Sequence, residues 1–422
     1  MFQFKNNGWI IASILTIFIM VTSQESSAQS KRKKGQKETA KQFELSDQML
    51  KMYSFRSIGP AAYSGRISDL AVNPENTSEY YVGVASGGLW KTINHGTTFE
   101  PIFDDQPVFS IGCLAMDPNN SNVVWVGTGE NNSQRNLAYG DGVYKTTDGG
   151  KSFTNMGLKT SSQIGKIIID PRNSNVVYVA AQGQAWGPGG ERGLYKTIDG
   201  GKTWKRILEV GEYTGISDME MDPRNPDVLY AATWQRHRTV AGYLGGGPGS
   251  GLHKSTDGGE TWRALKNGIP KSNLGKTGLA MSPFDSNVIY AALELDRTKG
   301  GVYMTTNGGE SWTKQSDAVS GGTGPHYYQE IIASPHHEGT LYFMNNSALI
   351  SKDHGKTFTN MSRSNQHSDS HALVFKPSDP NYLLIGTDGG LYESFDNTNS
   401  WKYVRNLPIT QYFKIAVDDA EP

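Results

Sequence analysis

The chain has only one cysteine, Cys113, and almost no net charge. A single cysteine excludes an internal disulfide, so an exported protein of this size would be held together by its core. Lysine and arginine total 40 against 41 acidic residues, and the charges are scattered. No basic face therefore indicates a nucleic acid or a membrane surface as partner. The sequence also lacks G-x-S-x-G, H-E-x-x-H and phosphate-loop motifs, and we predict neither a metal nor a cofactor.

Long apolar runs are missing apart from one near the start. Lys5, the apolar stretch 9–21 and the small residues Ser26 to Ala28 predict a secretory signal peptide over residues 1–28. That stretch is too short for a comfortable membrane span, so we expect no transmembrane segment in the mature chain. Residues 29–52 predict a polar, basic linker. We expect an exported protein, located in a bacterial periplasm, on the outer surface or in the medium.

What the chain has in abundance is glycine, with 49 residues, many of them in seven copies of one octapeptide. Each copy combines Ser or Thr, Asp or Asn two residues later and a closing aromatic, and every copy except the degraded one at 394–401 has glycine in its turn. The short polar side chain caps backbone N–H groups and glycine takes a positive φ, so the motif predicts a structural turn. Its central polar residues are Asn94, Asp148, Asp199, Asp257, Asn307, Asp353 and Asp396.

A second marker repeats in phase with the octapeptide. An apolar stretch ends in a polar residue followed by proline, as at Asp170-Pro171 and Asp222-Pro223. Two further strand-like stretches, the octapeptide and a fourth stretch follow each marker. Four short antiparallel strands per repeated unit are typical of a β-propeller blade. We therefore predict an all-β fold, a propeller of seven four-stranded blades within residues 53–422.

The two ends of the predicted ring allow alternatives. Residues 412–417 predict the first strand of an eighth blade, and residues 53–58 could form an outer strand that closes the last blade. The ring either closes at seven blades or is the front part of a longer protein. The abrupt end at Pro422 favours additional C-terminal domains beyond residue 422.

Loops of very uneven length join the second and third strands of each blade. Blades two to five carry insertions, which span residues 129–141, 182–192, 233–250 and 294–300. We expect these loops to lie on one face and to wall a groove over the central channel, where function tends to reside. Neutral variation in loop length is the alternative.

The insertions contain residues suited to a polar polymer. Tryptophan rings could stack on sugars or peptide side chains, and arginines could bind carboxylates. The alternative is that the tryptophans pack their own loops down. The candidate ligand-binding residues are Arg66, Arg135, Trp186, Arg192, Trp234, Arg236, His237, His367 and His371.

The tightest polar cluster is His367-Ser-Asp369-Ser-His371, placed at the start of the seventh inner strand. The period of two predicts that the two histidines and Asp369 share one face of the strand. A shared metal is disfavoured, because ligands lie about 2 Å from zinc whereas strand positions four apart are roughly 13 Å apart. The remaining roles for this cluster are a structural hydrogen-bond network and contact with a ligand.

Three acidic residues are candidates for catalysis at the channel mouth. Glycoside hydrolysis needs two carboxyl groups about 5 to 9.5 Å apart. Glu130 and Asp388 begin equivalent loops in blades two and seven. The third acid, Asp369, stands at the start of the inner strand expected for blade seven. Arg66, before the first inner strand, could hold an anionic group. An acid beside glycines is, however, more often a turn residue than a catalyst.

The octapeptide resembles the Asp-box, or BNR repeat, shared by sialidases, sortilin-type receptors, xyloglucan hydrolases and a photosystem II assembly factor. From Phe55 to Val417 the pattern is most similar to bacterial exported sortilin-like BNR-repeat proteins. The segments that carry this resemblance are Gly65–Ala71, Gly140–Lys145, Trp234–Arg238 and His367–Ala372.

The departures from these families shape the functional expectation. Ser68 follows Arg66-Ile67 where sialidases have proline, and Ala85-Ser86 stands where xyloglucan hydrolases place a catalytic aspartate. One cysteine excludes the cysteine-rich segment of sortilin receptors. We therefore expect a recognition module for a peptide, protein or polysaccharide. The alternatives are a glycosidase that uses the channel-mouth carboxylates and a scaffold that docks further domains.

Overall fold

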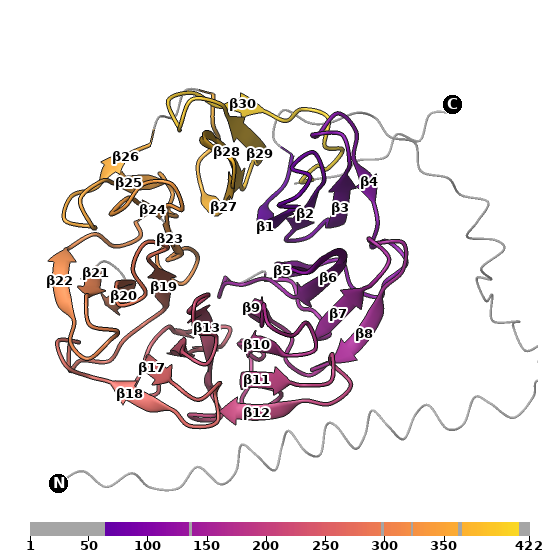
Figure 1. Ribbon diagram of the computed structural model, residues 1–422. Coiled ribbons are helices and arrows are strands. Elements are labelled where there is room, and N and C mark those ends of the chain that lie inside the picture. The colour runs from indigo at the N-terminus through magenta and orange to yellow at the C-terminus, as the bar shows by residue number, and fades with distance from the viewer. Residues whose placement is uncertain (1–63, 135–136, 297–298, 322–323, 362–364, 413–422) are drawn as a thin grey trace, which may run out of the picture. The chain divides into compact units, whose positions relative to one another are not determined.

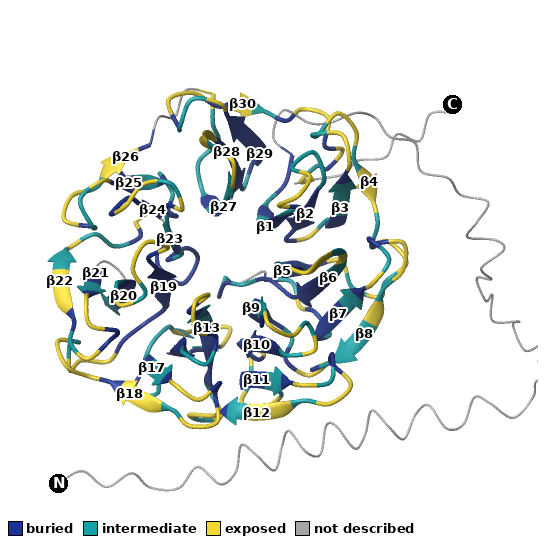
Figure 2. Ribbon diagram, in the orientation of Figure 1, coloured by how far each residue is buried: buried dark blue, intermediate teal, exposed yellow. Residues whose placement is uncertain are grey.

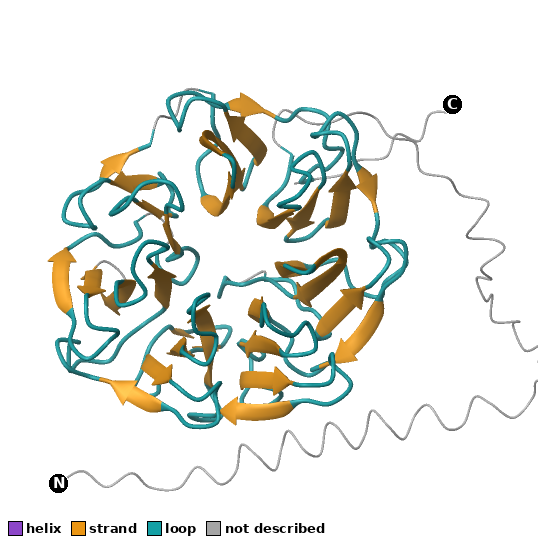
Figure 3. Cartoon of the chain, viewed as in Figure 1, coloured by secondary structure: helices purple, strands orange, loops and turns teal. Residues whose placement is uncertain are grey.

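The computed structural model describes residues 64–134, 137–296, 299–321, 324–361 and 365–412. The chain divides into residues 1–57 and residues 58–422, and every described residue lies in the second unit. The predicted signal peptide, the linker and the strand at 53–58 lie outside the described residues, as does 413–417 of the expected eighth-blade strand. The described part consists of strands and loops and has no helix that could span a membrane (Figure 3).

Seven antiparallel sheets of four strands each confirm the predicted propeller (Figure 1). Blade one has β1 (Ile67–Val72), β2 (Tyr80–Val84), β3 (Gly88–Thr92) and β4 (Glu100–Pro101). Blade two has β5 (Ile111–Asp117), β6 (Asn120–Thr128), β7 (Val143–Thr146) and β8 (Thr154–Gly157). Blade three has β9 (Ile164–Ile169), β10 (Val177–Ala181), β11 (Gly193–Thr197) and β12 (Lys205–Leu208).

Blade four carries an added hairpin. Its sheet has β13 (Thr214–Met221), β14 (Leu229–Gln235), β17 (Gly251–Ser255) and β18 (Arg263–Leu265), and the hairpin has β15 (His237–Arg238) and β16 (Tyr243–Leu244). Blade five has β19 (Thr277–Met281), β20 (Ile289–Asp296), β21 (Lys299–Thr305) and β22 (Thr313–Ser316). Blade six has β23 (Ile331–Ala333), β24 (Leu341–Phe343), β25 (Leu349–Ser351) and β26 (Thr359–Asn360), and blade seven has β27 (Ser370–Lys376), β28 (Asp379–Thr387), β29 (Gly390–Ser394) and β30 (Lys402–Tyr403).

The first strand of each blade lies innermost and lines the central channel (Figure 1). Several inner strands carry a β-bulge close to their start, for example between Ile67 and Asp69 in β1 and between Ile216 and Asp218 in β13. A bulge redirects the side chains that follow it. Asp69 and Asp218, which follow these bulges, are among the residues that line the channel.

The hydrophobic core is divided into seven clusters, each packed between two neighbouring blades. Apolar side chains alternate between the two faces of each sheet, so both faces are buried and the outer strands carry the exposed residues (Figure 2). One cluster joins blade seven to blade one through Ile67, Val84, Leu384 and Leu407. The ring therefore closes at seven blades.

Each Asp-box turn is fastened internally, and some are also bonded to the preceding blade. In blade two, Thr146 Oγ1 donates to Asp148 Oδ1 at 2.8 Å and accepts from the N–H of Gly150, while Ser152 donates to Asp148 Oδ2 at 2.6 Å. At two joints, those that lead to Gly258 and Gly308, a tyrosine and a lysine of one blade donate to a turn carbonyl of the next. Tyr178 Oη and Lys196 Nζ reach the carbonyl of Gly258 at 2.9 and 2.8 Å. The repeated Tyr-Lys pattern is thus a contact between blades.

Tyr178→Phe is expected to lower the free energy of unfolding by about 1 kcal/mol, the net worth of one buried hydrogen bond. The cost stays moderate because Lys196 still donates to the same carbonyl. Urea unfolding of Tyr178→Phe measures this loss. Tyr139→Phe is the control, since Tyr139 is 74% exposed. Equal stabilities of the two variants would contradict the proposed link between blades.

Candidate functional site

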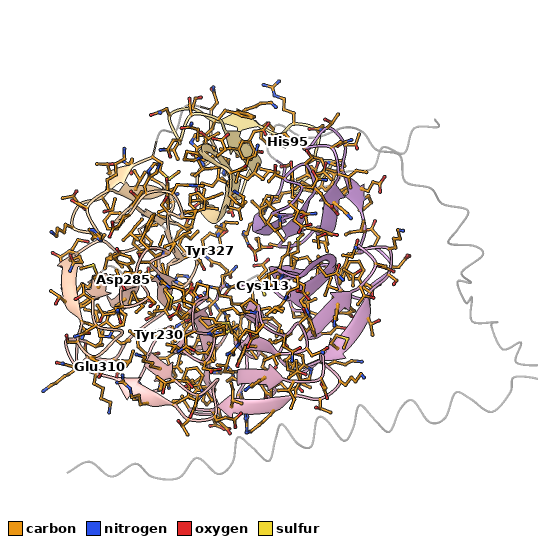
Figure 4. The ribbon with its side chains drawn as sticks, viewed as in Figure 1. His95, Cys113, Tyr230, Asp285, Glu310 and Tyr327 are labelled. Carbon is orange, nitrogen blue, oxygen red and sulfur yellow. The ribbon has the colours of Figure 1, made fainter. Side chains whose placement is uncertain are left out.

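A cavity of about 440 Å³ occupies the central channel and is lined by the inner strands and the segments that precede them. Tyr327 and Cys113 both line it and lie near the centre of the ring (Figure 4). Arg66, Glu130 and Asn132 line its end on the face that carries the long loops. We call this end the channel mouth.

Arg66 joins two acidic residues at the channel mouth. Its Nη1 lies 2.9 Å from Glu130 Oε2, and its Nε lies 2.8 Å from Asp388 Oδ1. The guanidinium also lies over the ring of Tyr327, 4.8 Å from the ring centre. One guanidinium thus contacts both carboxylates, so the two acids are close neighbours at the mouth. The residue predicted to hold an anionic group thus holds two anions of the protein itself.

Both carboxylates are saturated with hydrogen-bond donors. Glu130 accepts from Arg66, from Asn132 Nδ2 at 2.9 Å and from Ser86 Oγ at 3.3 Å. Asp388 accepts from Arg66, from His371 Nε2 at 2.8 Å and from Tyr327 Oη at 2.7 Å. Burial alone would raise the pKa of Asp388, but His371 and Arg66 outweigh it and hold that pKa well below its usual range. Asp388 is therefore an anion at neutral pH.

The long loops form a joined layer rather than separate walls. Residues 130–133 of the blade-two loop reach toward blades four and five. Arg236 Nη1 donates to the carbonyl of Asn132, Arg238 Nε to that of Ser133, and the N–H of Ser133 to the carbonyl of His326. The expected groove is thus partly crossed at the channel mouth by the blade-two loop.

Three predicted ligand-binding residues are buried inside this layer, which corrects their expected role. Trp234 is 1% exposed, donates from Nε1 to the carbonyl of Gly245 and has cations near its ring from Arg236 and Lys276. Arg192 donates to four carbonyls of its own loop. Burial and the nearby Arg192 lower the pKa of Arg236 to about 9, so it stays protonated at neutral pH. These three side chains donate their hydrogen bonds to carbonyl oxygens inside the layer. None of the three side chains is therefore available to a ligand.

The other candidates in the loops have different positions. Trp186 is 47% exposed and keeps a ring available for stacking. His237 packs edge-on against Tyr213, with 4.9 Å between ring centres. The ring of His367 lies beside the backbone of Gly389. Arg135 lies outside the described residues.

The predicted shared face of His367, Asp369 and His371 is wrong, because β27 begins only at Ser370. Asp369 has φ of 66°, which reverses the chain before the strand. Its carboxylate accepts from Tyr328 Oη, Asn346 Nδ2 and Ser368 Oγ. His371 instead reaches Asp388. Asp369 therefore belongs to a turn beside the site, whereas His371 belongs to the site.

Sequence reasoning missed the polar groups inside the channel. Lys166 Nζ lies 2.8 Å from both Asp218 and Glu220, and the almost fully buried Lys276 lies 2.7 Å from Glu330. It also missed Tyr327, which comes from the connection between blades five and six. All of these ion pairs join different blades, so no local pattern in the sequence signals them. In the described residues no three metal-ligating side chains converge.

Comparison with curated proteins finds xyloglucanases among the relatives of the chain. A xyloglucanase of Paenibacillus sp is 22% identical over 345 residues, which cover 73% of this chain and 32% of the enzyme. A xyloglucanase of Hypocrea jecorina is 28% identical over 231 residues, 46% of this chain and 25% of the enzyme. The matched region thus spans about a third or less of these relatives' own length.

Solved structures agree with the fold. The GH74 xyloglucanase of Xanthomonas campestris superposes with a TM-score of 0.61 at 16% identity, over 83% of this chain and 56% of the enzyme. YCF48 bound to D1 peptide superposes with a TM-score of 0.52 at 15% identity, over 81% of this chain and 98% of YCF48. At such identities the likeness shows the propeller fold alone.

The family comparison extends over well over half of the chain. The Sortilin-Vps10 model, described as sortilin, neurotensin receptor 3, matches residues 141–297 and 300–420. These residues include five complete blades, from β9 to β30, and the predicted Asp-box turns within them. The chain belongs to the Sortilin-Vps10 family.

Proposed function

We propose that the chain is a recognition module that binds an extended polar ligand, a peptide or a polysaccharide, at the channel mouth and across the neighbouring loops. The relatives and neighbours include enzymes named for a polysaccharide and a protein bound to a peptide. We also propose, from the predicted signal peptide, that it acts as an exported protein. The loops of blades two to four are fixed to one another, which suits a preformed binding surface.

One observation favours this function over glycoside hydrolysis. A glycosidase needs a protonated carboxyl group to donate to the leaving oxygen and a second, free carboxylate. Here Arg66 contacts both acids at the mouth, and Asp388 has a lowered pKa. Glu130 accepts hydrogen bonds from Arg66, Asn132 and Ser86, so its oxygens are engaged within the protein. These contacts favour recognition over proton donation to a leaving group.

Release of reducing ends from xyloglucan tests this directly. The chain is expected to release none above the level of Glu130→Gln and Asp388→Asn variants, because Arg66 and other donors of the protein already engage both acids. Retardation of the same chain in xyloglucan-containing native gels, beside peptide-array binding, would detect recognition without cleavage. Release that disappears in either variant, while Glu310→Gln at the rim keeps it, would overturn the proposal and identify a glycosidase.

A further inference from the structure

Three aromatic side chains on the face of the long loops are exposed to solvent. Phe109 is 62%, Tyr139 74% and Trp186 47% exposed. Among the described residues, none of the three rings contacts another ring or a cation, and the indole N–H of Trp186 has no acceptor. The indoles of Trp204 and Trp234, by contrast, donate to carbonyl oxygens of the protein. Isolated apolar side chains are common on a protein surface, whereas neighbouring ones indicate an interaction site.

Phe109 and Tyr139 stand on segments that are bonded to each other. Phe109 precedes Ser110, whose carbonyl accepts from the N–H of Gly129 at 2.9 Å. Gly129 begins the blade-two loop, and Gly140 lies against it at the end of that loop, because a Cβ on Gly129 would come within 2.9 Å of the Gly140 nitrogen. Tyr139 is the residue before Gly140. The two rings therefore extend from adjoining backbone of blade two.

The blade-three loop with Trp186 adjoins the same backbone, and blades two and three are neighbours in the ring (Figure 1). The N–H of Gly140 donates to the carbonyl of Ser162 at 2.7 Å, in the connection between the two blades. In that connection the N–H of Thr160 donates to Glu191 Oε2 at 2.9 Å, and Glu191 belongs to the loop that carries Trp186. The three rings therefore lie on one bonded layer of the long-loop face.

The backbone around Trp186 is fixed before any ligand arrives. Arg192 Nη2 donates to the carbonyls of Gln184 and Gly187, which lie on either side of Trp186, at 2.6 and 3.0 Å. The N–H of Arg238 donates at 2.8 Å to the carbonyl of the residue just before Trp186. A ring on fixed backbone loses little conformational entropy when a ligand binds. The indole is therefore preorganised for stacking.

The loops that carry Tyr139 and Trp186 hold little free charge. In the described parts of loops 129–141 and 182–192, every charged side chain is bonded within the protein, namely Glu130, Asp141, Glu191 and Arg192. An ionic ligand thus finds no unpaired charge there. The groups that remain for a ligand are the ring faces, the indole N–H and the phenol hydroxyl. These groups match an uncharged ligand.

A neutral sugar ring has the complementary groups. Its C–H face stacks on an aromatic ring, and its hydroxyls bond an indole N–H or a phenol hydroxyl. An apolar peptide side chain, by comparison, gains most of its affinity in an enclosing, desolvated pocket. Rings that are about half to three quarters exposed form open faces rather than such a pocket. Several open faces on one layer suit a polymer of sugar rings.

We propose that Phe109, Tyr139 and Trp186 form a stacking platform for an uncharged polysaccharide. The inference rests on the proposed function and narrows its ligand from a polar polymer to a neutral glycan. It also assigns the contact to ring faces, rather than to the acids at the channel mouth. Because no charge takes part in the contact, the affinity should not change with salt concentration.

Calorimetric titration of the whole chain with four soluble probes tests the proposal. Xyloglucan and galactomannan are uncharged, polygalacturonate is acidic, and an end-blocked decaproline peptide represents a polypeptide with ring-shaped side chains. At least one uncharged polymer is expected to bind, with the same affinity in low and high salt, whereas polygalacturonate should not bind. Binding of the peptide alone would assign the platform to polypeptides and overturn the proposal.

Ring variants locate the binding at the platform. Trp186→Ala and Tyr139→Ala are each expected to weaken binding about three- to tenfold, the usual worth of one stacked ring, whereas Trp186→Phe and Tyr139→Phe should retain most of it. Phe284→Ala is the matched control, because Phe284 is 45% exposed but lies in the turn between β19 and β20, on the opposite face, and it should bind like the parent chain. Melting temperatures identify any variant that fails to fold, in which case the other ring carries the test.

Several results would overturn the platform without touching the proposed function. They are equal binding of polygalacturonate, unchanged affinity in both alanine variants, and no binding of either uncharged polymer. Recognition of a peptide at the channel mouth can still stand in each case, and peptide-array binding measures it. Conversely, cleavage of xyloglucan would refute the recognition module, and stacking would then be measured in whichever of Glu130→Gln and Asp388→Asn is inactive.

Discussion

Arg66→Ala is expected to lower the free energy of unfolding by about 3 to 5 kcal/mol, the usual cost of removing one partner from a buried ion pair. The side chain of Glu130 is only 5% exposed and that of Asp388 is 24% exposed. Without the guanidinium, two neighbouring carboxylates would repel one another with little water to screen them. Tyr327 would also lose the cation over its ring. Denaturant unfolding of the variant and the parent at pH 7 measures the loss.

The pH dependence of this loss provides its control. The folded pKa of Asp388 lies below the unfolded value of about 3.9, so its contribution to stability is present above that value and disappears as pH falls through the folded pKa. The difference between parent and Arg66→Ala should therefore shrink below about pH 4. Arg66→Lys keeps the charge but not the planar fork, and should recover only part of the loss. A difference under 1 kcal/mol that is constant with pH would show that Arg66 holds neither acid.

Trp234→Ala is expected to cost about 3 to 5 kcal/mol, as for other large buried aromatics. The indole is fully enclosed between the blade-four loop, Arg236 and Lys276, and its Nε1 satisfies the carbonyl of Gly245. Its removal leaves a cavity beside two buried cations and one carbonyl without a donor. Thermal or urea unfolding reads out this effect.

Trp186→Ala is the matched control, because it removes the same side chain from an adjacent loop where the ring is 47% exposed. Its effect on stability should stay within about 0.5 kcal/mol. If stacking at the loops contributes to recognition, this second variant is the one that weakens ligand binding at unchanged stability. Similar stability losses in both variants would contradict the burial of Trp234 inside the loop layer.

The features that could be predicted from the sequence are those fixed by neighbours in the chain. An Asp-box turn such as Thr146–Phe153 is closed by bonds that span four residues or fewer, so its residues alone specify it. The blade count followed from these turns. The equivalence of Glu130 and Asp388 followed as well, since each comes after the second strand of its blade. Arg66 was placed at the mouth for the same reason, although its two partners were not foreseen.

What could not be predicted depends on contacts between distant loops. Arg236 looked like a ligand-binding residue because its loop is long, yet its partner Asn132 is 104 positions away. Trp234 was likewise predicted to contact a ligand but is buried in the loop layer, and no local pattern distinguishes it from the exposed Trp186. The face of Asp369 was mispredicted because a single residue at positive φ delays the start of β27. A positive φ is uncommon outside glycine, and it leaves no periodic pattern in the sequence.

The joint between blades seven and one has a consequence for the order of folding. Six of the seven interblade cores join neighbouring stretches of the chain, but the seventh brings together residues such as Ser64 and Gly389, which are 325 positions apart. The entropy of closing so large a loop opposes this contact until the other six are in place. We therefore expect an open arc of blades as the last species before the native ring. Among the described residues no strand is exchanged across the joint, so this joint is where the ring should first open under mild denaturation.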